Sequence, residues 1–287
     1  MDEKQIKLKK TIMDTKTLPT LPSVINKLNS LSDNDKSSVQ EMARIVSSDQ
    51  ALSARILRLA NSPSYGFYRV STISNAMILL GVNVVKSLAI SSSIFEVMEK
   101  NSVGLWEHSL GTGVASNLIA NKLGLPESEE IATAGLLHDI GKVIINLKCS
   151  EAECEVRRVI DEKHIYMREA ELEVIGADHA EVGGWLAKSW FLPDKLTEPI
   201  SCHHNVETSE NYRIKTSVVH MADVLIKASG FGDSGDSFVP PIQQAAWDAL
   251  KLNDGIIAEL VEELEDKLVE VRNFSLELQQ GGDAPPC

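Results

Sequence analysis

LLHDIGKV, residues 136–143, places a histidine and an aspartate side by side within a run that is otherwise largely apolar. Burying ionisable groups without a partner costs free energy, so His138 and Asp139 need a partner, and a metal ion is one. The alternative is a helix end at which both side chains meet solvent. Lys142 lies one turn beyond His138 and can share its helix face. This stretch alone leaves a metal site and a solvated helix end equally open.

The composition around this stretch is that of a globular chain. Of the 287 residues, 43% are hydrophobic and 24% are charged, and the length allows one large domain or two ordinary ones. The net charge of −13 argues against nucleic acid as a partner, because neutralising a phosphate backbone needs clustered lysine and arginine. A small phosphate ester remains compatible with this charge if a metal supplies local positive charge.

Neither a secretory signal nor a membrane span is visible in the sequence. The first ten residues, MDEKQIKLKK, are charged throughout and lack the apolar region of a signal peptide. No apolar run approaches the ~20 residues of a membrane-spanning helix. CxxC pairing and disulfide-framework spacing are both absent from the four cysteines, Cys149, Cys154, Cys202 and Cys287. We therefore expect a cytoplasmic protein with reduced thiols and no membrane association.

Helical periodicity dominates the chain, and no segment of strand length alternates with a two-residue period. We expect helices over residues 37–48, 50–61, 72–81, 82–99, 105–124, 128–142, 178–193 and 254–271. Ser128 is the expected N-cap of its helix, and Asp178 forms a capping box with Glu181. An apolar stripe along residues 254–271 predicts core packing, with a homodimer seam as the alternative. The predicted fold class is therefore all-α.

All seven histidines lie between His108 and His220, and this clustering is the main chemical signal of the chain. Five of them fall with two aspartates on successive helical segments: His108, His138, Asp139, His179, His203, His204 and Asp223. Imidazoles and carboxylates together are the ligand set of iron, manganese and zinc. A lone histidine is more often a structural residue, but seven such groups favour a metal site. His164 and His220 are expected to be structural, with His220 at most supporting a ligand.

Other catalytic motifs are absent from the sequence. It contains neither the glycine-rich dinucleotide motif nor the P-loop motif, and no serine lies in a GxSxG elbow. Cys202 and His203 are adjacent, so on a helix their side chains point in different directions. This geometry disfavours a cysteine nucleophile activated by its neighbour.

At the candidate ligands the chain resembles known families. His108, the pair His138–Asp139 and Asp223 match the H…HD…D order of the HD superfamily of metal-dependent phosphohydrolases. In the N-terminal half, LPTLPSVINKL, IVSSDQALSARILRLANSPSYG and ISNAMILLGVNVVKSLAI resemble the HDOD family, bacterial signalling domains built on an HD-like helical fold. The resemblance covers residues 17–230, which is most of the chain.

The resemblance implies a multi-helix, HD-like HDOD domain over residues 17–230. An N-terminal helical lobe, residues 17–100, would pack on an HD-like lobe, residues 101–230, that holds the metal site. The remaining segments would be an N-terminal extension (1–16), a loop with a C-terminal amphipathic helix (231–274) and a disordered tail (275–287).

The candidate ligands also resemble those of the HD-GYP phosphodiesterases, which bind two or three metal ions. The matching motifs are HDIGK, DHAEVG and CHH, followed by Asp223. The resemblance implies that Asp139 bridges two ions, and that Lys142 faces a bound phosphate or water. It assigns one ion to His108, His138 and Asp223, and the other to His179, His203 and His204. No GYP triplet follows the double histidine, and Gly104 stands where some members carry a glutamate.

These families imply different functions, which leaves three interpretations. HDOD domains are generally treated as non-catalytic. The first interpretation is therefore a bacterial signal-transduction module whose metal site is structural or binds a ligand without turning it over. Its partner would be a signalling protein or a small phosphate-containing molecule. The second is a metal-dependent phosphohydrolase acting on a nucleotide or cyclic nucleotide, with Lys142 and Asp139 as catalytic residues. The third is a scaffold with an empty site. We favour regulation with two divalent ions, iron or manganese before zinc.

Overall fold

The computed structural model describes residues 8–10, 12, 39–48, 50–65, 70–82, 84–85, 87–89, 103–236 and 238–280. Across these residues the regular secondary structure is helical and contains no strand, so the predicted all-α fold is confirmed. None of the helices in this part of the chain is long and apolar enough to cross a membrane.

The described chain folds into a succession of helices. In order they are α3 (Val39–Ser47), α4 (Gln50–Ala60), α5 (Ile73–Leu80), α7 (Val103–Lys122), α8 (Ser128–Leu137), α9 (Ile140–Lys148), α10 (Ser150–Lys163), α11 (Met167–Val174), α12 (His179–Ser189), α13 (Asp194–Cys202), α14 (Arg213–Ser229), α15 (Gln244–Leu250) and α16 (Asp254–Gln280). The 3₁₀ turns η1 (Pro63–Tyr65) and η2 (Val206–Thr208) interrupt this succession.

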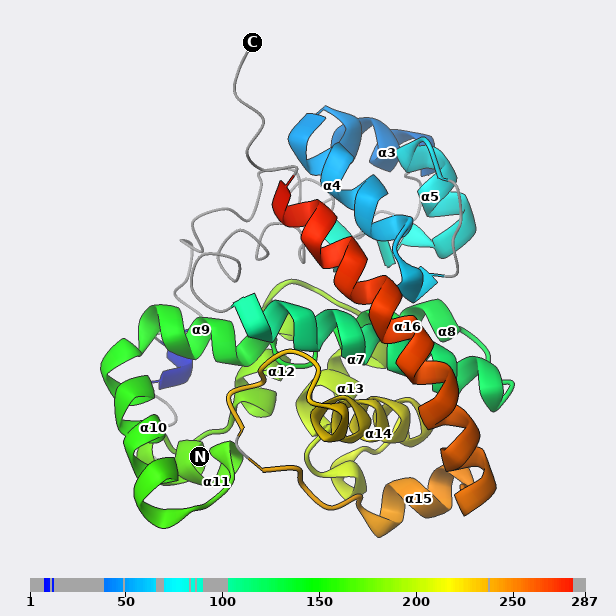
Figure 1. Ribbon diagram of the computed structural model, residues 1–287. Coiled ribbons are helices and arrows are strands. Elements are labelled where there is room, and N and C mark those ends of the chain that lie inside the picture. Colours follow the sequence, from blue (N-terminus) through cyan, green and yellow to red (C-terminus); the bar gives the residue numbers. More distant parts are fainter. Residues whose placement is uncertain are drawn as a thin grey trace.

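An N-terminal lobe of α3, α4 and α5 lies at one end of a larger lobe that contains α7 to α15 (Figure 1). Leu52 and Ile56 of α4 are buried. Thr72 caps α5 by accepting a hydrogen bond from the Asn75 amide at 3.2 Å. The helix ends before Gly81, as its sequence predicts.

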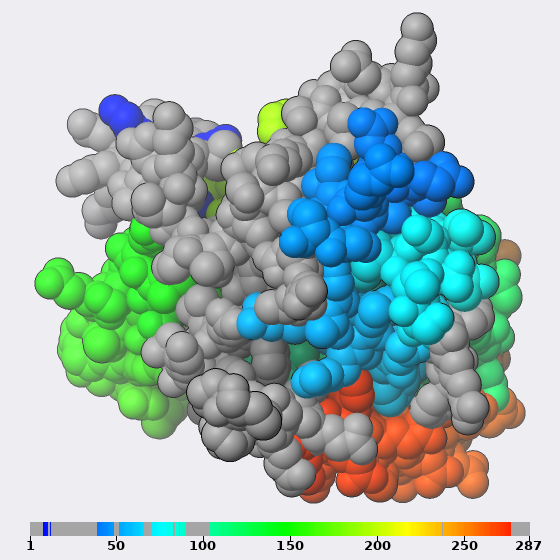
Figure 2. Space-filling model, turned by 90° about the horizontal axis from the view of Figure 1, so that it is seen from above, coloured from blue at the N-terminus to red at the C-terminus, as the bar shows by residue number. Residues whose placement is uncertain are grey.

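Helix α16 and the turn η1 join the two lobes. The turn η1 contacts α7 and α8, and the buried Tyr65 hydroxyl lies 3.0 Å from Thr133 Oγ1 of α8. Helix α16 contacts both α7 and η1 (Figure 1), and Figure 2 shows it beside the N-terminal lobe on one face of the molecule. The predicted apolar stripe of α16 is buried within the chain, through Leu260, Leu264, Leu268 and Val271.

Helix α16 is longer than its sequence predicts. It runs to Gln280, so the boundary placed after residue 274 is wrong. Ser275 is fully buried, and the residues that follow, LELQQ, are good helix formers. Gly281 and Gly282 come next in the sequence, where a helix is expected to stop. The rest of the predicted tail, residues 281–287, lies outside the described residues.

The two predicted helix caps have different outcomes. Asp178 accepts a hydrogen bond from the Glu181 amide at 2.8 Å, and Glu181 accepts one from the Asp178 amide at 3.2 Å, which confirms the capping box before α12. Ser128 is the first residue of α8 and not its N-cap. Glu127 takes the cap position at φ 59° without a side-chain hydrogen bond to the helix. Its carboxylate instead pairs with Lys215 of α14 at 2.5 Å.

The helix predicted over residues 128–142 is broken at the HDIGK motif. Helix α8 ends at Leu137 and α9 begins at Ile140. Asp139 stands between them with φ −94° and ψ 12°. Beyond this break, α9 packs against α12.

Gly141 allows α9 to cross α12 at close range. A Cβ atom at this position would overlap the carbonyl oxygen of His179, the first residue of α12. Helix α12 in turn packs against α13, the helix that precedes His203. The glycine of HDIGK therefore lets the elements that carry Asp139, His179 and His203 come together.

Replacing Gly141 should destabilise the larger lobe. Gly141→Ala forces a methyl group against main chain, and we expect the free energy of unfolding to fall by about 3 kcal/mol, the upper end for overpacking in a core. Chemical denaturation followed by circular dichroism measures the change. Gly255→Ala, in the exposed first turn of α16, is the control and should change the free energy by less than about 1 kcal/mol. Equal losses in the two variants would show that the close approach is absent.

Candidate metal centre

The candidate ligands come from separate helices and meet in the core of the larger lobe. They are His108 in α7, His138 after α8, Asp139 before α9, His179 at the start of α12, His203 and His204 after α13, and Asp223 in α14. All except the half-buried His204 are at most 1% exposed. The structure thus brings together every residue that the sequence suggested as a ligand.

The ligand atoms of His108, His138 and Asp223 form a first group and lie within 4.8 Å of one another. His108 Nε2 is 3.0 Å from Asp223 Oδ1 and 3.3 Å from His138 Nε2. His138 Nε2 is in turn 3.5 Å from Asp223 Oδ1. Two imidazole nitrogens and a carboxylate oxygen therefore surround one small space.

A second group consists of Asp139, His179, His203 and His204, again with ligand atoms within 4.8 Å of one another. Asp139 Oδ1 lies 3.2 Å from His179 Nε2 and 3.9 Å from His203 Nε2. The Nε2 atoms of His179 and His204 are 2.7 Å apart. The division into these two groups is the one that the HD-GYP resemblance implies.

Asp139 lies between the two groups. Its Oδ2 atom is 3.3 Å from His138 Nε2 and 3.6 Å from His108 Nε2, on the side of the first group. Its Oδ1 atom faces His179 in the second group. A single carboxylate thus offers one oxygen to each group, which is the arrangement of a bridging ligand.

Hydrogen bonds orient three of the imidazole rings. His138 and His203 each donate from Nδ1 to a main-chain carbonyl, at 2.7 and 2.8 Å. His179 donates from Nδ1 to Glu171 Oε2 at 2.6 Å. With Nδ1 as the donor, the Nε2 atom of each ring is directed into the cluster, as in metal-binding histidines. Glu171 was not predicted from the sequence, since nothing local links it to His179.

Several acceptor atoms at the centre have no donor. Asp139 Oδ1, Asp223 Oδ1 and His203 Nε2 are buried, and none takes part in a hydrogen bond within the described part of the chain. Each buried polar group left without a partner costs about 1–3 kcal/mol. Cations placed among these atoms would satisfy them, and imidazole nitrogen with carboxylate oxygen suits iron, manganese or zinc. The residues present therefore fit a metal centre.

The electrostatics of each group favour a cation. Burial lowers the pKa of His138, but Asp139 and Asp223 outweigh burial and raise this pKa to about 9. Burial also opposes the charged form of His179, but Glu171 and Asp139 raise its pKa to about 9. The raised pKa means that one histidine in each group favours its protonated, positively charged form. A metal ion bound there would supply positive charge in the same place.

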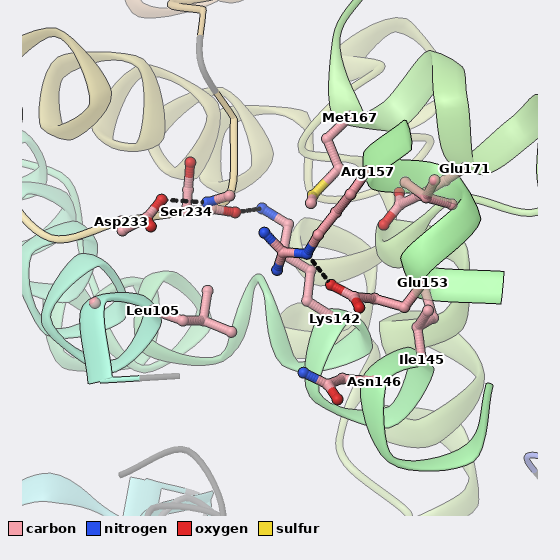
Figure 3. Close-up of a pocket in the computed structure, with 13 residues that line it drawn as sticks. Leu105, Lys142, Ile145, Asn146, Glu153, Arg157, Met167, Glu171, Asp233 and Ser234 are labelled. Atoms are coloured by element: carbon pink, nitrogen blue, oxygen red, sulfur yellow. Dashed lines mark hydrogen bonds and ion pairs between the residues drawn. The ribbon is translucent and has the colours of Figure 1, made fainter. Parts of the chain in front are cut away.

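Lys142 lies beside Asp139. Its Nζ atom donates to Asp139 Oδ2 at 2.7 Å and to the main-chain carbonyl of Ser234 at 2.9 Å. The predicted shared face with His138 is wrong because α8 ends before His138 and α9 begins after Asp139. Lys142 also lines a cavity of about 240 Å³ together with Arg157 (Figure 3).

A second buried lysine was not predicted from the sequence. Lys227 follows Asp223 by one turn of α14 and donates to Asp223 Oδ2 at 3.0 Å. Burial lowers the pKa of Lys227, but Asp223, Asp139 and Asp236 outweigh burial and hold the pKa above its ordinary value. The signal that could have found Lys227 is its position, four residues after a candidate ligand in an apolar helix.

His220 and Gln243 support the double histidine. His220 donates from Nδ1 to the main-chain carbonyl of His203 at 2.8 Å. Its Nε2 atom accepts a hydrogen bond from the main-chain amide of Gln243 at 3.0 Å. Gln243 also donates from Nε2 to the carbonyl of His204 at 2.7 Å. His220 therefore holds the turn that carries two candidate ligands. His164 is exposed at the end of α10 and belongs to neither group.

Comparisons with known proteins match most of this chain to a known domain. The family model of the HDOD domain matches residues 18–206. A solved HDOD domain protein of unknown function from Geobacter sulfurreducens is 26% identical, with a TM-score of 0.70, and the match covers 94% of this chain and 99% of that chain. A "Putative phosphohydrolase" from Shewanella amazonensis SB2B is 25% identical, with a TM-score of 0.66, over 93% of this chain and 97% of that chain.

A curated relative extends well beyond the matched region. This uncharacterized protein from Treponema pallidum is 27% identical over 218 residues. The match covers 73% of this chain and 42% of the relative, so it spans less than half of that protein's length. Because the HDOD model matches more than half of the present chain, the chain belongs to the HDOD domain family.

Proposed function

We propose that this chain is a bacterial signal-transduction module whose larger lobe binds two divalent metal ions. The observation that carries the proposal is the pair of buried ligand groups that share Asp139. Each group contains a buried acceptor atom without a hydrogen-bond donor. Each also contains a histidine whose pKa is raised by neighbouring carboxylates. These features support one ion in each group. Membership of the HDOD family supports a regulatory role.

Each ion has its own protein ligands in this proposal. One set is His108, His138 and Asp223, the other is His179, His203 and His204, and Asp139 contributes an oxygen to both. Bound ions would supply positive charge that cross-links the helices and attracts an anionic ligand. Mixed nitrogen and oxygen ligands with a bridging carboxylate favour iron or manganese, with zinc as the alternative. The module would act on a signalling protein or respond to a small phosphate-containing ligand.

The burial of the centre favours regulation over turnover. Six of the seven candidate ligands are at most 1% exposed, so a substrate could approach the centre only through the small cavity that His108 lines or past the half-buried His204. A protected centre is suited to holding helices in one arrangement, which a partner protein can recognise. Turnover instead needs repeated entry of substrate and release of product.

A metal-dependent phosphohydrolase is the second candidate. It is favoured by the full ligand set and by Lys142, a cation beside Asp139 that could hold a phosphate oxygen. The Shewanella amazonensis protein, whose name proposes a phosphohydrolase, shares 25% identity with this chain.

The purified chain should contain about two metal ions, since seven ligands exceed the four of a single tetrahedral ion. Elemental analysis of protein purified without chelators measures this content. Asp139→Ala removes the shared ligand and should lower the content of both ions. His164→Ala removes an exposed histidine outside both groups and should keep the wild-type content. Wild-type protein with less than about a tenth of an ion per chain, even after reconstitution with iron or manganese, would rule out the centre.

Lys142→Ala separates regulation from catalysis. If the chain is regulatory, wild type and variant both hydrolyse bis(4-nitrophenyl) phosphate at the background rate with iron, manganese or zinc. In a phosphohydrolase, loss of a cation that stabilises transition-state charge costs about 100-fold or more in rate, while the metal is retained. Lys188→Ala, at an exposed position of α12, controls for the loss of a lysine. Robust wild-type hydrolysis that Lys142→Ala alone abolishes would overturn the regulatory proposal.

A further inference from the structure

One face of α16 points away from the rest of the described chain. Figure 1 shows the helix crossing in front of α7, and Figure 2 shows it along one edge of the molecule. The opposite face, with the buried apolar stripe, packs into the fold. The outward face still carries apolar side chains, because Val261 is 40% exposed, Val269 62% and Leu276 46%. Single exposed apolar side chains are common on protein surfaces, so their spacing decides whether this face can bind a partner.

The residues along the middle of this face follow a heptad spacing. Alternate intervals of four and three residues separate its members, which are Ala258, Glu262, Glu265, Val269, Arg272 and Leu276. All six are exposed. This alternation is the a and d pattern by which two helices pair along a seam. Charged residues within such a seam weaken the pairing but fix its register and direction.

The charged residues decide how two copies of α16 can pair. In a parallel pair each residue faces its own counterpart, so Glu262 would face Glu262 and Arg272 would face Arg272. Like charges in contact disfavour that arrangement. In an antiparallel pair centred on Lys267, residues equally far before and after the centre face each other. Glu262 then faces Arg272 of the second copy, and twofold symmetry forms this pair twice.

The same register matches the other positions of the seam. Ala258 faces Leu276, so a small side chain lies opposite a large one. Glu265 faces Val269, which its aliphatic stem can cover while its carboxylate reaches solvent. Lys267 is the midpoint of α16, so the two helices overlap along their whole length. The outward face of α16 is therefore complementary to itself.

Glu262 and Arg272 are free to form ion pairs with a second copy. Neither takes part in an ion pair with another residue of the described chain. Two other glutamates of α16 pair with Lys122 of α7 and hold the helix on the fold. The guanidinium of Arg272 lies 5.5 Å from the ring centre of Phe231, a contact that limits its motion without neutralising its charge.

We propose that α16 is a docking surface for a second copy of this chain, and that two copies pair antiparallel along it with Glu262 against Arg272. The interface is twofold symmetric, as in most homo-oligomers. One pair of helices buries less area than a standard interface, so we expect a dissociation constant on the order of 10 µM. The dimer would join two copies through the helix that contacts both α7 and η1. This pairing does not depend on the proposed metal centre.

Sedimentation equilibrium of the full chain at about 1–200 µM, a range that brackets the expected dissociation constant, tests the pairing. Arg272→Glu sets two carboxylates against each other at both ends of the seam and should raise the dissociation constant at least about tenfold. Glu262→Arg sets two guanidinium groups against each other and should weaken pairing to a similar extent. The double variant exchanges the charges and restores both pairs, so its dissociation constant should lie within about threefold of wild type.

A mixture of the two single variants gives an independent check. Each copy then meets its opposite charge at both ends of the seam, so the mixture should pair about as tightly as wild type. Lys188→Glu and Glu210→Arg make the same charge changes at exposed positions outside α16. These controls should stay within about twofold of wild type, because solvent and salt screen isolated exposed charges.

Circular dichroism of each variant reports whether it is folded. Glu262→Arg removes no contact within the described part of the chain. This variant therefore keeps the pairing testable even if Arg272→Glu disturbs the fold by losing the contact with Phe231.

Wild type that remains monomeric at about 200 µM overturns the inference. A dimer that neither single variant weakens also overturns it, because the interface then lies elsewhere. A double variant that pairs no better than the single variants contradicts the antiparallel register and the inference with it. Elemental analysis tests the metal centre separately, so failure of the pairing leaves the proposed function standing.

Discussion

Burial of the Asp139 carboxylate is the constraint around which the larger lobe is arranged. Asp139 is 1% exposed, and its two oxygens face imidazole nitrogens on different helices. A buried charge of this kind must be paired, and the partners come from α7, α9 and α12. Gly141 removes the side chain that would hold α9 and α12 apart. HDIGK therefore supplies the candidate bridging ligand, the lysine beside it and the close helix contact that brings His179 within reach.

Linkage between metal binding and helix packing connects this arrangement to the proposed regulatory function. The centre combines buried acceptor atoms that lack donors with Lys142 and Lys227, which pair with its two aspartates. Because the ligands come from different helices, filling the centre stabilises one packing of those helices by linkage.

The sequence predicted the candidate ligands because most of them carry a local signal. The pair His138–Asp139 interrupts an apolar run, two histidines are adjacent after α13, and Asp223 lies in an apolar helix. Periodicity and caps likewise predicted α4, α5 and the start of α12. The lysine contacts with Ser234 and Asp236 join residues far apart in the chain, so no local pattern reports them. The break at Asp139 was missed for a similar reason, since apolar residues continue across it from α8 into α9.

Anomalous X-ray diffraction from crystals of the chain, recorded at the absorption edges of iron, manganese and zinc, tests the central claim most directly. It both locates each bound ion and identifies the element. The account predicts two peaks about 3.5–4 Å apart, the separation of known two-metal sites. They should lie on either side of the Asp139 carboxylate, one next to His108 and one next to His203. A single peak, or peaks at other residues, would contradict a two-metal centre bridged by Asp139.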